Sequence, residues 1–540
     1  MTRWLIAAVG LLAFIGSAHA AATLADLAQA GQDAAALKMI DAGVDVNAPQ
    51  SDATTALDWA VYRLDIPLAG ALLKHGANPN LANNLGSSPL EEAVEAGNFE
   101  LVKMLLQAGA KVDNPGPDGQ TALMAATHTG VLQTVKLLVR HGASVNAREQ
   151  MHGQTALMWA VALKDPEVAK YLIDHGANVD TRAYFNDWLD KEGELTSEPR
   201  AQNRPEGGLT PLLYAVRSGC LDCVQALLKK GADMNRPTPE GITPLIAAID
   251  NRHYDVAKYL LQHGANLKTW DWYGRTPLYV AVDVHTYNDF GRAGPASGPS
   301  ATVATKDTQP QTNAVDIIRM LLGAGADPNA QLDLWRPGRG ANSGRFEDNL
   351  LHTGATPLLR AAMSHDNVVI QLLLAHGASV DLPNDEGVTP LIAAAGMGFR
   401  GPHGSLVPDH RGDYAPGAES RAVATLAILL EAGANVNARV TDDDTVSYLT
   451  RIGRNDSLQH RQGQTALYGA IYWNWASVVQ FLLQHDAKAN VVDSFGQTPL
   501  MVATHGNEEV GTPGYAPDKA IIAMLAHAVD GQVALLQSSP

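Results

Sequence analysis

The sequence predicts a mostly α-helical solenoid of helix-turn-helix units joined by β-hairpins and interrupted by loop insertions. Two observations predict this class. A Thr-Pro/Ala-Leu pattern recurs eleven times with minor variation, and each copy leads into a segment resembling V-x-x-L-L-x-x-G-A. Self-similarity with a period of about 20–50 residues is the signature of repeat architectures. The chain's 540 residues also exceed what one hydrophobic core usually serves, so we expect units stacked along one axis.

The recurring pattern marks the start of the first helix in each unit. A Thr hydroxyl caps the free amides of a helix start, and Pro at the first helical position loses no hydrogen bond. The first four copies begin 33, 33 and 34 residues apart. The copies begin at Thr55, Ser88, Thr121, Thr155, Thr210, Thr243, Thr276, Thr356, Thr389, Thr465 and Thr498.

The second helix of each unit is predicted from apolar residues at helical spacing, as in Val256, Tyr259 and Leu260. A glycine such as Gly264 then ends the helix, because a left-handed residue stops it there. Turn residues such as those at 117–119 suit a tight hairpin. A histidine before the final glycine suits the negative end of a helix dipole. It occurs as His75, His141, His175, His263 and His376.

This order of hairpin, helix and helix at about 33 residues resembles the ankyrin repeat. The resemblance covers nearly the whole chain after residue 20, with about twelve repeats. It implies a non-catalytic protein that binds a protein partner through its hairpin tips and first helices. One departure is systematic, because no copy keeps the His of the family motif T-P-L-H, so its inter-repeat hydrogen bonds are not expected. The replacing residues are Asp58, Glu91, Met124, Met158, Leu213, Ile246, Tyr279, Leu359, Ile392, Tyr468 and Met501.

The repeats divide the chain into alternating regular and inserted segments. The insertions are interpreted either as flexible padding, which loops tolerate cheaply, or as ordered lobes that bind something. We expect a signal peptide at 1–20, a capping repeat at 21–53, repeats at 54–182, 209–330, 355–439 and 464–530, and a tail at 531–540. Insertions are expected at 183–208, 331–354 and 440–463 on the hairpin side, and near 286–312, 397–419 and 505–517 between paired helices.

The first twenty residues predict export. Arg3 supplies a positive charge, residues 4–15 are apolar, and Ala18-His19-Ala20 fits a signal-peptidase site, with cleavage after Ala20. The alternative is an uncleaved anchor or a buried first helix. We expect a periplasmic or secreted monomer with no membrane insertion of the mature chain. A formal net charge of -17 disfavours nucleic-acid partners, because an acidic surface repels phosphates.

Partner-binding candidates are aromatic and charged residues at hairpin tips and at the variable ends of first helices. Trp272 and Tyr273 fall at a predicted tip, where large aromatics are costly unless covered. Aromatics and Arg are typical interface anchors, although each aromatic can instead pack against a neighbouring insertion. The other candidates are Tyr472, Trp473, Tyr62, Arg63, Arg217, Asp250 and Asp283. Trp59 and Trp159 follow the motif at a core position and are interpreted as packing residues.

The two cysteines raise an alternative function. Cys220 and Cys223 form a C-x-x-C at a predicted helix start, where a helix dipole lowers a thiol pKa. Cys223 also occupies a core position of the repeat, so a structural role competes with a redox one. The loop containing His403, Asp409, His410 and Asp413 matches no known zinc spacing and is interpreted as a polar loop.

No P-loop, H-E-x-x-H or G-x-S-x-G motif occurs in the chain. We therefore expect no enzyme activity, no cofactor and no metal. The predicted function is a protein-binding scaffold outside the cytoplasm. The alternative is an accessory protein to an exported redox or metal-dependent enzyme.

Overall fold

A computed structural model describes residues 22–116, 118–186, 206–286, 312–333, 354–397, 417–441, 462–505 and 518–538. The chain divides into two compact units, Met1–Tyr184 (unit 1) and Phe185–Pro540 (unit 2). The described parts of both units are stacked helix pairs, which confirms the predicted mostly helical repeat class. Within these ranges, no helix has the length and apolar content needed to cross a membrane.

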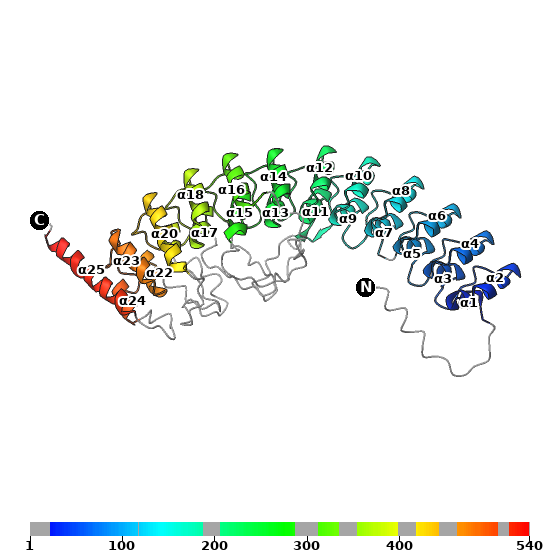
Figure 1. The fold of residues 1–540 in the computed structure, drawn as a ribbon, viewed down its shortest axis with the longest axis horizontal. Coiled ribbons are helices and arrows are strands. Elements are labelled where there is room, and N and C mark those ends of the chain that lie inside the picture. The colour runs from blue at the N-terminus through cyan, green and yellow to red at the C-terminus, as the bar shows by residue number, and fades with distance from the viewer. Residues whose placement is uncertain are drawn as a thin grey trace, which may run out of the picture. The chain divides into compact units, whose positions relative to one another are not determined.

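Unit 1 contains five helix pairs. Figure 1 shows the first helices of successive pairs in one row and the second helices in a second row. The pairs are α1 (Leu24–Ala30) with α2 (Asp33–Asp41), α3 (Ala56–Tyr62) with α4 (Ile66–Lys74), α5 (Pro89–Glu95) with α6 (Phe99–Gln107), α7 (Ala122–Thr129) with α8 (Leu132–Arg140), and α9 (Ala156–Ala162) with α10 (Pro166–Asp174).

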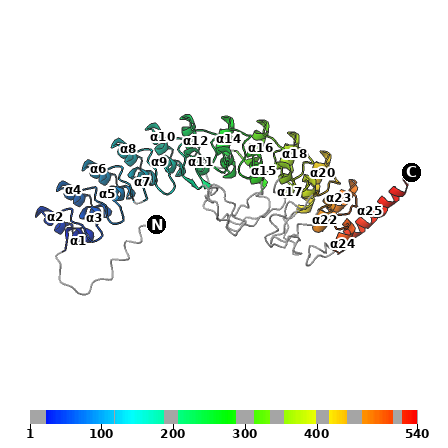
Figure 2. The same ribbon diagram turned by 180° about the vertical axis from the view of Figure 1, so that it is seen from behind.

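Unit 2 repeats the arrangement, as seen from behind in Figure 2. Its pairs are α11 (Pro211–Ser218) with α12 (Leu221–Lys229), α13 (Pro244–Asp250) with α14 (Tyr254–Gln262), α15 (Pro277–Thr286) with α16 (Ala314–Gly323), α17 (Pro357–Met363) with α18 (Asn367–Ala375), α19 (Pro390–Ala394) with α20 (Ala418–Glu431), α22 (Ala466–Tyr472) with α23 (Ala476–Gln484), and α24 (Pro499–His505) with α25 (Lys519–Ser538).

The first helices begin where the repeated pattern predicts. The hydroxyl of Thr243 accepts a hydrogen bond from the Ile246 amide at 3.3 Å, and Thr389 and Thr210 cap their helices in the same way. The leucine two residues after the cap is buried in α3, α5, α7 and α9, with exposures of 1% for Leu57 and 0% for Leu157. Burying one such side chain contributes about 1.5–3 kcal/mol, so this layer holds the stack together.

The second helices end as their histidines predict. Nδ1 of His75 lies 2.8 Å from the carbonyl oxygen of Ala71, and His263 makes the same contact with Tyr259 at 2.8 Å. The backbone amides of His75 and His263 donate to the same two carbonyls, so each carbonyl oxygen has both a ring nitrogen and a backbone amide as partners at the helix end. The following glycines, such as Gly264, have positive φ, which confirms the left-handed stop.

The predicted hairpins take the form of tight turns closed by backbone hydrogen bonds, such as that from the Asn83 amide to the Ser87 carbonyl at 3.1 Å, and single bonds also join one turn to the next. The amide of Asn84 donates to the Asp52 carbonyl at 2.9 Å, and the amide of Gln150 donates to Asp118 at 2.9 Å. Strands within the described ranges are limited to β1 (Phe185–Asn186), which pairs antiparallel with β2 (Glu206–Gly207). The turns therefore connect the repeats as hairpins do, without forming further strands among the described residues.

One residue at the missing histidine position restores a bond between repeats. The Tyr468 hydroxyl lies 2.7 Å from the carbonyl oxygen of Gln497, in the turn that leads to the next repeat, and donates to it. The expectation that such bonds are absent is therefore wrong at this copy. Tyrosine reaches the same backbone because its hydroxyl, like an imidazole N–H, is a hydrogen-bond donor on a planar ring.

The predicted insertions lie largely outside the described residues, but the ends of the hairpin-side insertions are described. The amide of Leu332 donates to Ala355 at 3.1 Å, and the amide of Val440 donates to Gln464 at 2.9 Å. Phe185 pairs with Gly207 at the ends of the first hairpin-side insertion, 183–208. Each repeat thus closes its turn before the chain leaves it.

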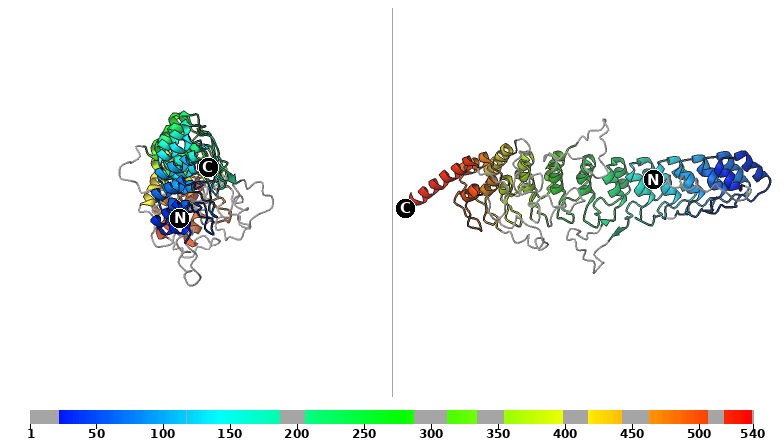
Figure 3. Two further views of the ribbon diagram at one scale, coloured as in Figure 1. Left: turned by 90° about the vertical axis from the view of Figure 1, so that its right-hand side faces the viewer. Right: turned by 90° about the horizontal axis from the view of Figure 1, so that it is seen from below.

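The expected tail after Gly531 is helical instead. Helix α25 continues to Ser538, and Figure 3 shows it as one helix at the C-terminus. Gly531 costs a helix only about 1 kcal/mol relative to Ala. The good helix formers Ala534, Leu535 and Leu536 follow it, so the helix carries on.

In most repeats the second residue before the second helix takes a left-handed conformation, and it is not always glycine. Gly97 and Gly130 occupy this place with φ of 66° and 69°, whereas Lys164 has φ 60°. A left-handed residue with a Cβ costs about 1–2 kcal/mol. We expect Lys164→Gly to raise the free energy of unfolding by about 0.5–1 kcal/mol, after the greater chain entropy of glycine is subtracted.

The matched control reverses the exchange at Gly97. A Cβ at Gly97 meets no atom within 4 Å, so Gly97→Ala changes only backbone preference. We expect it to lower stability by about 1 kcal/mol. Urea denaturation of both variants measures the two shifts, and shifts of the same sign contradict the conformational explanation.

Candidate functional site

One face of the first helices in unit 1 is open and rich in aromatic and acidic side chains. Residues four and seven positions after each cap lie on the same side of a helix. In unit 1 the aromatic, acidic and histidine side chains at these positions are half-buried or exposed, and Tyr62 reaches 51% exposure, whereas Leu27 and Ala125 are buried. We name this set the first-helix face. It consists of Trp59, Tyr62, Glu92, Glu95, His128 and Trp159.

The two tryptophans of the first-helix face are held by hydrogen bonds. Nε1 of Trp59 donates to Oε1 of Gln50 at 2.8 Å, and Nε1 of Trp159 donates to Oε1 of Gln154 at 2.7 Å. Tyr62 stands edge-on to Trp59 at 5.8 Å between ring centroids. The interpretation of Trp59 and Trp159 as core residues is therefore only half right, because each ring also has an accessible part.

A group of carboxyl side chains lies at the centre of this face. Asp58 is 2% exposed, and its Oδ2 accepts from the Thr55 amide at 2.6 Å and hydroxyl at 2.8 Å. Burial raises the pKa of Glu92 to about 8, with further contributions from the charges of Asp58, Glu95 and Glu91. Burial also raises the pKa of Asp58. Sequence reasoning did not single out these residues.

The turns of unit 1 also present apolar side chains. Leu85 is 64% exposed, Met151 is 71% exposed and Tyr184 is 50% exposed. The Arg148 guanidinium lies over the Tyr184 ring at 4.5 Å from its centroid. Large exposed apolar groups at several turns are typical of a surface that contacts another protein.

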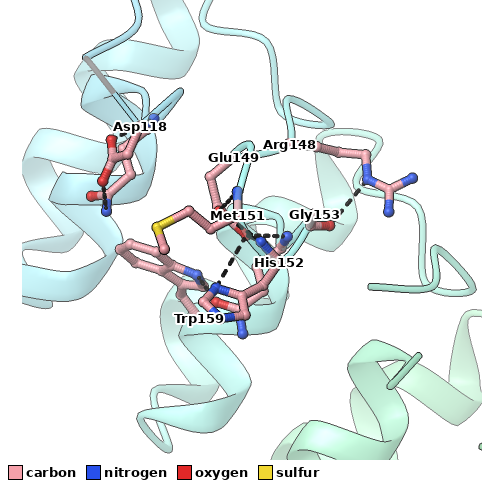
Figure 4. Close-up of polar contacts among 9 residues, drawn as sticks. Asp118, Arg148, Glu149, Met151, His152, Gly153 and Trp159 are labelled. Atoms are coloured by element: carbon pink, nitrogen blue, oxygen red, sulfur yellow. Dashed lines mark hydrogen bonds and ion pairs between the residues drawn. The ribbon is translucent and has the colours of Figure 1, made fainter. Parts of the chain in front are cut away.

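Glu149 shapes the turn that carries Met151. In a 33-residue repeat, Oδ1 of Asn83 accepts from the amides of Leu85 and Ser87, two and four residues ahead. The repeat of Glu149 has 34 residues. The Glu149 carboxylate, on a longer side chain than that of Asn83, accepts from the backbone amides of Met151, His152 and Gln154 (Figure 4). The extra methylene of Glu matches the extra residue of the loop.

Replacing Glu149 tests this role. Burial alone would raise the pKa of Glu149, but hydrogen bonds from the amides of Gln154, His152 and Met151 outweigh it and lower the pKa. The carboxylate therefore stabilises the fold above its ordinary pKa of 4.5, and this stability is lost as pH falls through the lower native value. We expect Glu149→Gln to cost about 1.5–3 kcal/mol at neutral pH.

The pH dependence separates this effect from a simple packing defect. Urea denaturation from neutral to acidic pH should show the difference between wild type and Glu149→Gln shrinking as the carboxylate is protonated. Glu100→Gln is the control, because its side chain is 59% exposed and pairs only with Lys103 at 4.0 Å. A difference that persists unchanged at acidic pH contradicts the capping role.

The aromatic candidates of unit 2 are more buried than an exposed tip requires. Tyr273 is 6% exposed and Trp272 is half-buried, whereas their neighbour Trp270 is 61% exposed. The Asp271 carboxylate accepts from the Tyr273 amide at 3.0 Å, which turns that residue inward. Trp270 is the exposed aromatic that the sequence analysis missed. Trp270 lies one residue before the turn that Asp271 and Arg275 close, and this position could have identified it as exposed.

Trp473 packs inside unit 2. It is 4% exposed, its Nε1 donates to the Gly396 carbonyl at 2.9 Å, and its ring stacks on Trp475 at 5.9 Å. Tyr472 is half-buried, and its hydroxyl accepts from Nε2 of Gln464 at 2.8 Å. The packing alternative therefore describes Trp473 better than an exposed anchor does.

The charged candidates differ in accessibility. Arg63 is exposed and pairs with Asp33 at 3.4 Å, and Arg217 is exposed. Asp250 is half-buried and lies 3.9 Å from the Arg275 guanidinium. Asp283 is 0% exposed and accepts from Nε of Arg360 at 2.8 Å. The expectation of an exposed Asp283 is wrong, because Arg360, 77 residues later in the sequence, covers its carboxylate and pairs with it.

The cysteines serve the start of α12. Cys220 and Cys223 form a disulfide and are 7% and 0% exposed. Cys220 is the N-cap residue, and its Sγ lies 3.3 Å from the Cys223 amide. Asn98 and Asp165 cap the equivalent helices α6 and α10, so the pair takes a structural position of the repeat.

The polar loop with His403, Asp409, His410 and Asp413 lies outside the described residues. Where the structure does describe the chain, no three His, Cys, Asp or Glu side chains gather as metal ligands would.

Comparison with known proteins identifies the repeat. The family model described as ankyrin repeats (3 copies) matches residues 24–115, 110–183, 212–289, 311–401 and 435–511. The chain belongs to the ankyrin-repeat family. Among solved structures, this ankyrin-repeat protein is similar to the human ASB11 ankyrin repeat domain, with 23% sequence identity and a TM-score of 0.35. The match covers 45% of this chain and 98% of that one. Ankyrin repeats indicate a scaffold for protein–protein interaction.

Proposed function

We propose that this ankyrin-repeat protein is an exported, non-catalytic scaffold that binds a protein partner through the first-helix face and turns of unit 1. The carrying observation is the presence of oriented aromatics at two places on that face, in α3 and in α9. Trp59 and Trp159 are fixed by glutamine hydrogen bonds, and Tyr62 is 51% exposed beside Trp59. Rigid, accessible aromatics are the side chains that most often dominate protein interfaces.

Two features support export. The first twenty residues have the charge, apolar length and small-residue ending of a secretory signal. The Cys220–Cys223 disulfide is also in keeping with an oxidising compartment, because cytosolic reductants keep most thiols reduced. We propose a periplasmic or secreted location on these grounds.

The test is recovery of the partner from the native compartment. The full-length chain, exported with an affinity tag, is purified gently and co-purifying proteins are identified by mass spectrometry. We expect one protein in stoichiometric amount. Tyr62→Ala should weaken its binding free energy by about 1–3 kcal/mol. Tyr171→Ala, in a second helix, is the matched control and should leave binding unchanged.

If both variants capture the partner equally, the partner does not bind at Tyr62. The next residues to change are then in unit 2, namely Trp270, the half-buried Trp272 and Arg217. Absence of any protein partner would contradict the scaffold function.

The alternative is an accessory protein to an exported redox or metal-dependent enzyme. The disulfide is the one observation that favours it, and its burial and capping position favour the structural role. Bound metal in the purified chain, or a cysteine pair that titrates reversibly under mild reduction, would support the alternative.

A further inference from the structure

Asp58 and Glu92 are carboxyl groups whose buried oxygens have incomplete hydrogen bonding. Oδ1 of Asp58 and Oε2 of Glu92 are both buried and have no hydrogen-bond partner among the described residues. Asp58 is 2% exposed, and Oδ2 alone is satisfied by Thr55. A buried carboxylate without full hydrogen bonding or a counter-ion is costly, so an oxygen left in this state indicates a missing partner.

The charges around this pair are all of one sign. Each group that acts electrostatically on Glu92 is another carboxyl group, namely Asp58 of α3 and Glu91 and Glu95 of its own helix. On the other side, α7 presents Ala125 at the equivalent position and His128 one turn further on. Arg63 of α3 is engaged with Asp33 and the Ala28 carbonyl. The site therefore attracts a positive group.

Two aromatic residues lie on the same helix as Asp58. Trp59 occupies the position of Glu92 in the preceding repeat, and Tyr62 is one turn away on the same helix. Gln50 fixes the Trp59 indole and is itself held by Asp26, whose oxygen accepts from Nε2 at 2.7 Å. Ring faces attract ammonium and guanidinium groups, with Trp the strongest. Carboxylates and rings together suit an organic cation.

We propose that unit 1 binds an extended, basic segment of its partner protein, with one lysine or arginine side chain inserted between Asp58, Glu92 and the rings of Trp59 and Tyr62. This inference rests on the proposed function and names the chemistry of the partner. Charge complementarity selects the occupant, because a chain of net charge -17 with an acidic centre in an aromatic face repels acidic segments.

The absence of a metal-ligand cluster among the described residues leaves an organic cation as the better match than a metal ion. Protons compete for the same oxygens, since burial and neighbouring carboxylates raise the pKa of Glu92 to about 8. Insertion of a cation favours the ionised form of Glu92. Binding near neutral pH should therefore release a proton, which separates this site from ordinary surface attraction.

The test uses the full chain and a short acetylated peptide of alternating serine and lysine. Titration calorimetry near neutral pH, repeated in two buffers of different ionisation enthalpy, gives both affinity and proton release. We expect wild type to release about one proton per peptide and Glu92→Gln to release none. The affinity should fall about 10–100-fold in Glu92→Gln.

Glu100→Gln removes the same charge from the second helix of the same repeat and is the matched control. Its side chain is 59% exposed, so it should change affinity less than about twofold and leave proton release intact. Equal losses in the two variants, or binding without proton release, would overturn the proposal, because both indicate general attraction to an acidic surface. A peptide with glutamine in place of lysine should not bind.

Failure of this inference and failure of the scaffold function give different results. If the native partner co-purifies equally with wild type and Glu92→Gln, the scaffold stands and the cationic insertion is wrong. If no protein partner is recovered and the lysine peptide still binds through Glu92, the site exists and the scaffold function is wrong. Misfolding is not a confounding cause, because Glu92→Gln is expected to stabilise the chain.

Discussion

Replacing Glu92 by Gln should make the protein more stable at neutral and alkaline pH. Burial, followed by the charges of Asp58, Glu95 and Glu91, raises the pKa of Glu92 from 4.5 to about 8. Between these values the folded chain binds more protons than the unfolded chain, so stability falls as pH rises. The slope approaches about 1.4 kcal/mol per pH unit for one group.

The expected gain follows from that slope. Above the native pKa of Glu92 the ionised carboxylate opposes folding by up to about 5 kcal/mol, and a neutral amide avoids a large part of this cost. We expect Glu92→Gln to raise the free energy of unfolding of unit 1 by about 2–3 kcal/mol above pH 8, and by little below pH 4.5. Urea denaturation across this range measures the effect.

The Glu100→Gln control should show neither the gain nor the altered pH slope, since exposed ion pairs contribute less than about 1 kcal/mol. A Glu92→Gln variant that is less stable than wild type at every pH would mean that the carboxylate makes a favourable internal contact. If Glu92→Gln is instead more stable than wild type and binds the basic peptide more weakly, Glu92 is a residue kept for function at a cost in stability.

The repeat itself could be predicted from the sequence because its determinants are local. Thr243 caps its helix through a hydroxyl three residues from the amide it satisfies, and Gly264 ends one through its own backbone angle. Such features need no knowledge of distant residues. Periodicity then multiplies each local signal over successive copies, which is why the helix pairs lie where the pattern predicts them.

The site could be predicted only in part, because accessibility depends on neighbours in other repeats. Asp250 and Asp283 share a register with the exposed Arg217, yet Asp283 is enclosed by Arg360 of α17. Glu92 was missed because it follows Glu91, whose role in a capping box with Ser88 accounts for an acidic first turn. A comparison of the repeats could have identified Glu92, because the other repeats of unit 1 have uncharged residues such as Trp59, Ala125 and Trp159 at its position.

Breaking the buried ion pair in unit 2 should cause the largest loss of stability. Arg360 is 1% exposed and Asp283 is 0% exposed, with Nε 2.8 Å from Oδ1, and Nη1 of Arg360 also donates to the Ser364 hydroxyl. The pair joins α15 to α17, the first helices of consecutive repeats. Arg360→Met leaves a buried carboxylate without its counter-ion, and we expect a loss of about 3–5 kcal/mol.

The double variant decides whether the pair stabilises or only specifies this junction. Replacing both ions, as Asp283→Asn with Arg360→Met, removes the desolvation cost together with the attraction and should recover most of the loss. Hydrogen exchange of α15 and α17 locates the effect, because adjacent repeats are coupled mainly through their shared interface.

Arg319→Met is the matched control, since Arg319 is 55% exposed and pairs with Asp316 at 3.1 Å. It should cost less than about 1 kcal/mol. If the double variant is as unstable as Arg360→Met, the attraction outweighs desolvation and the pair is a net source of cohesion between the two repeats.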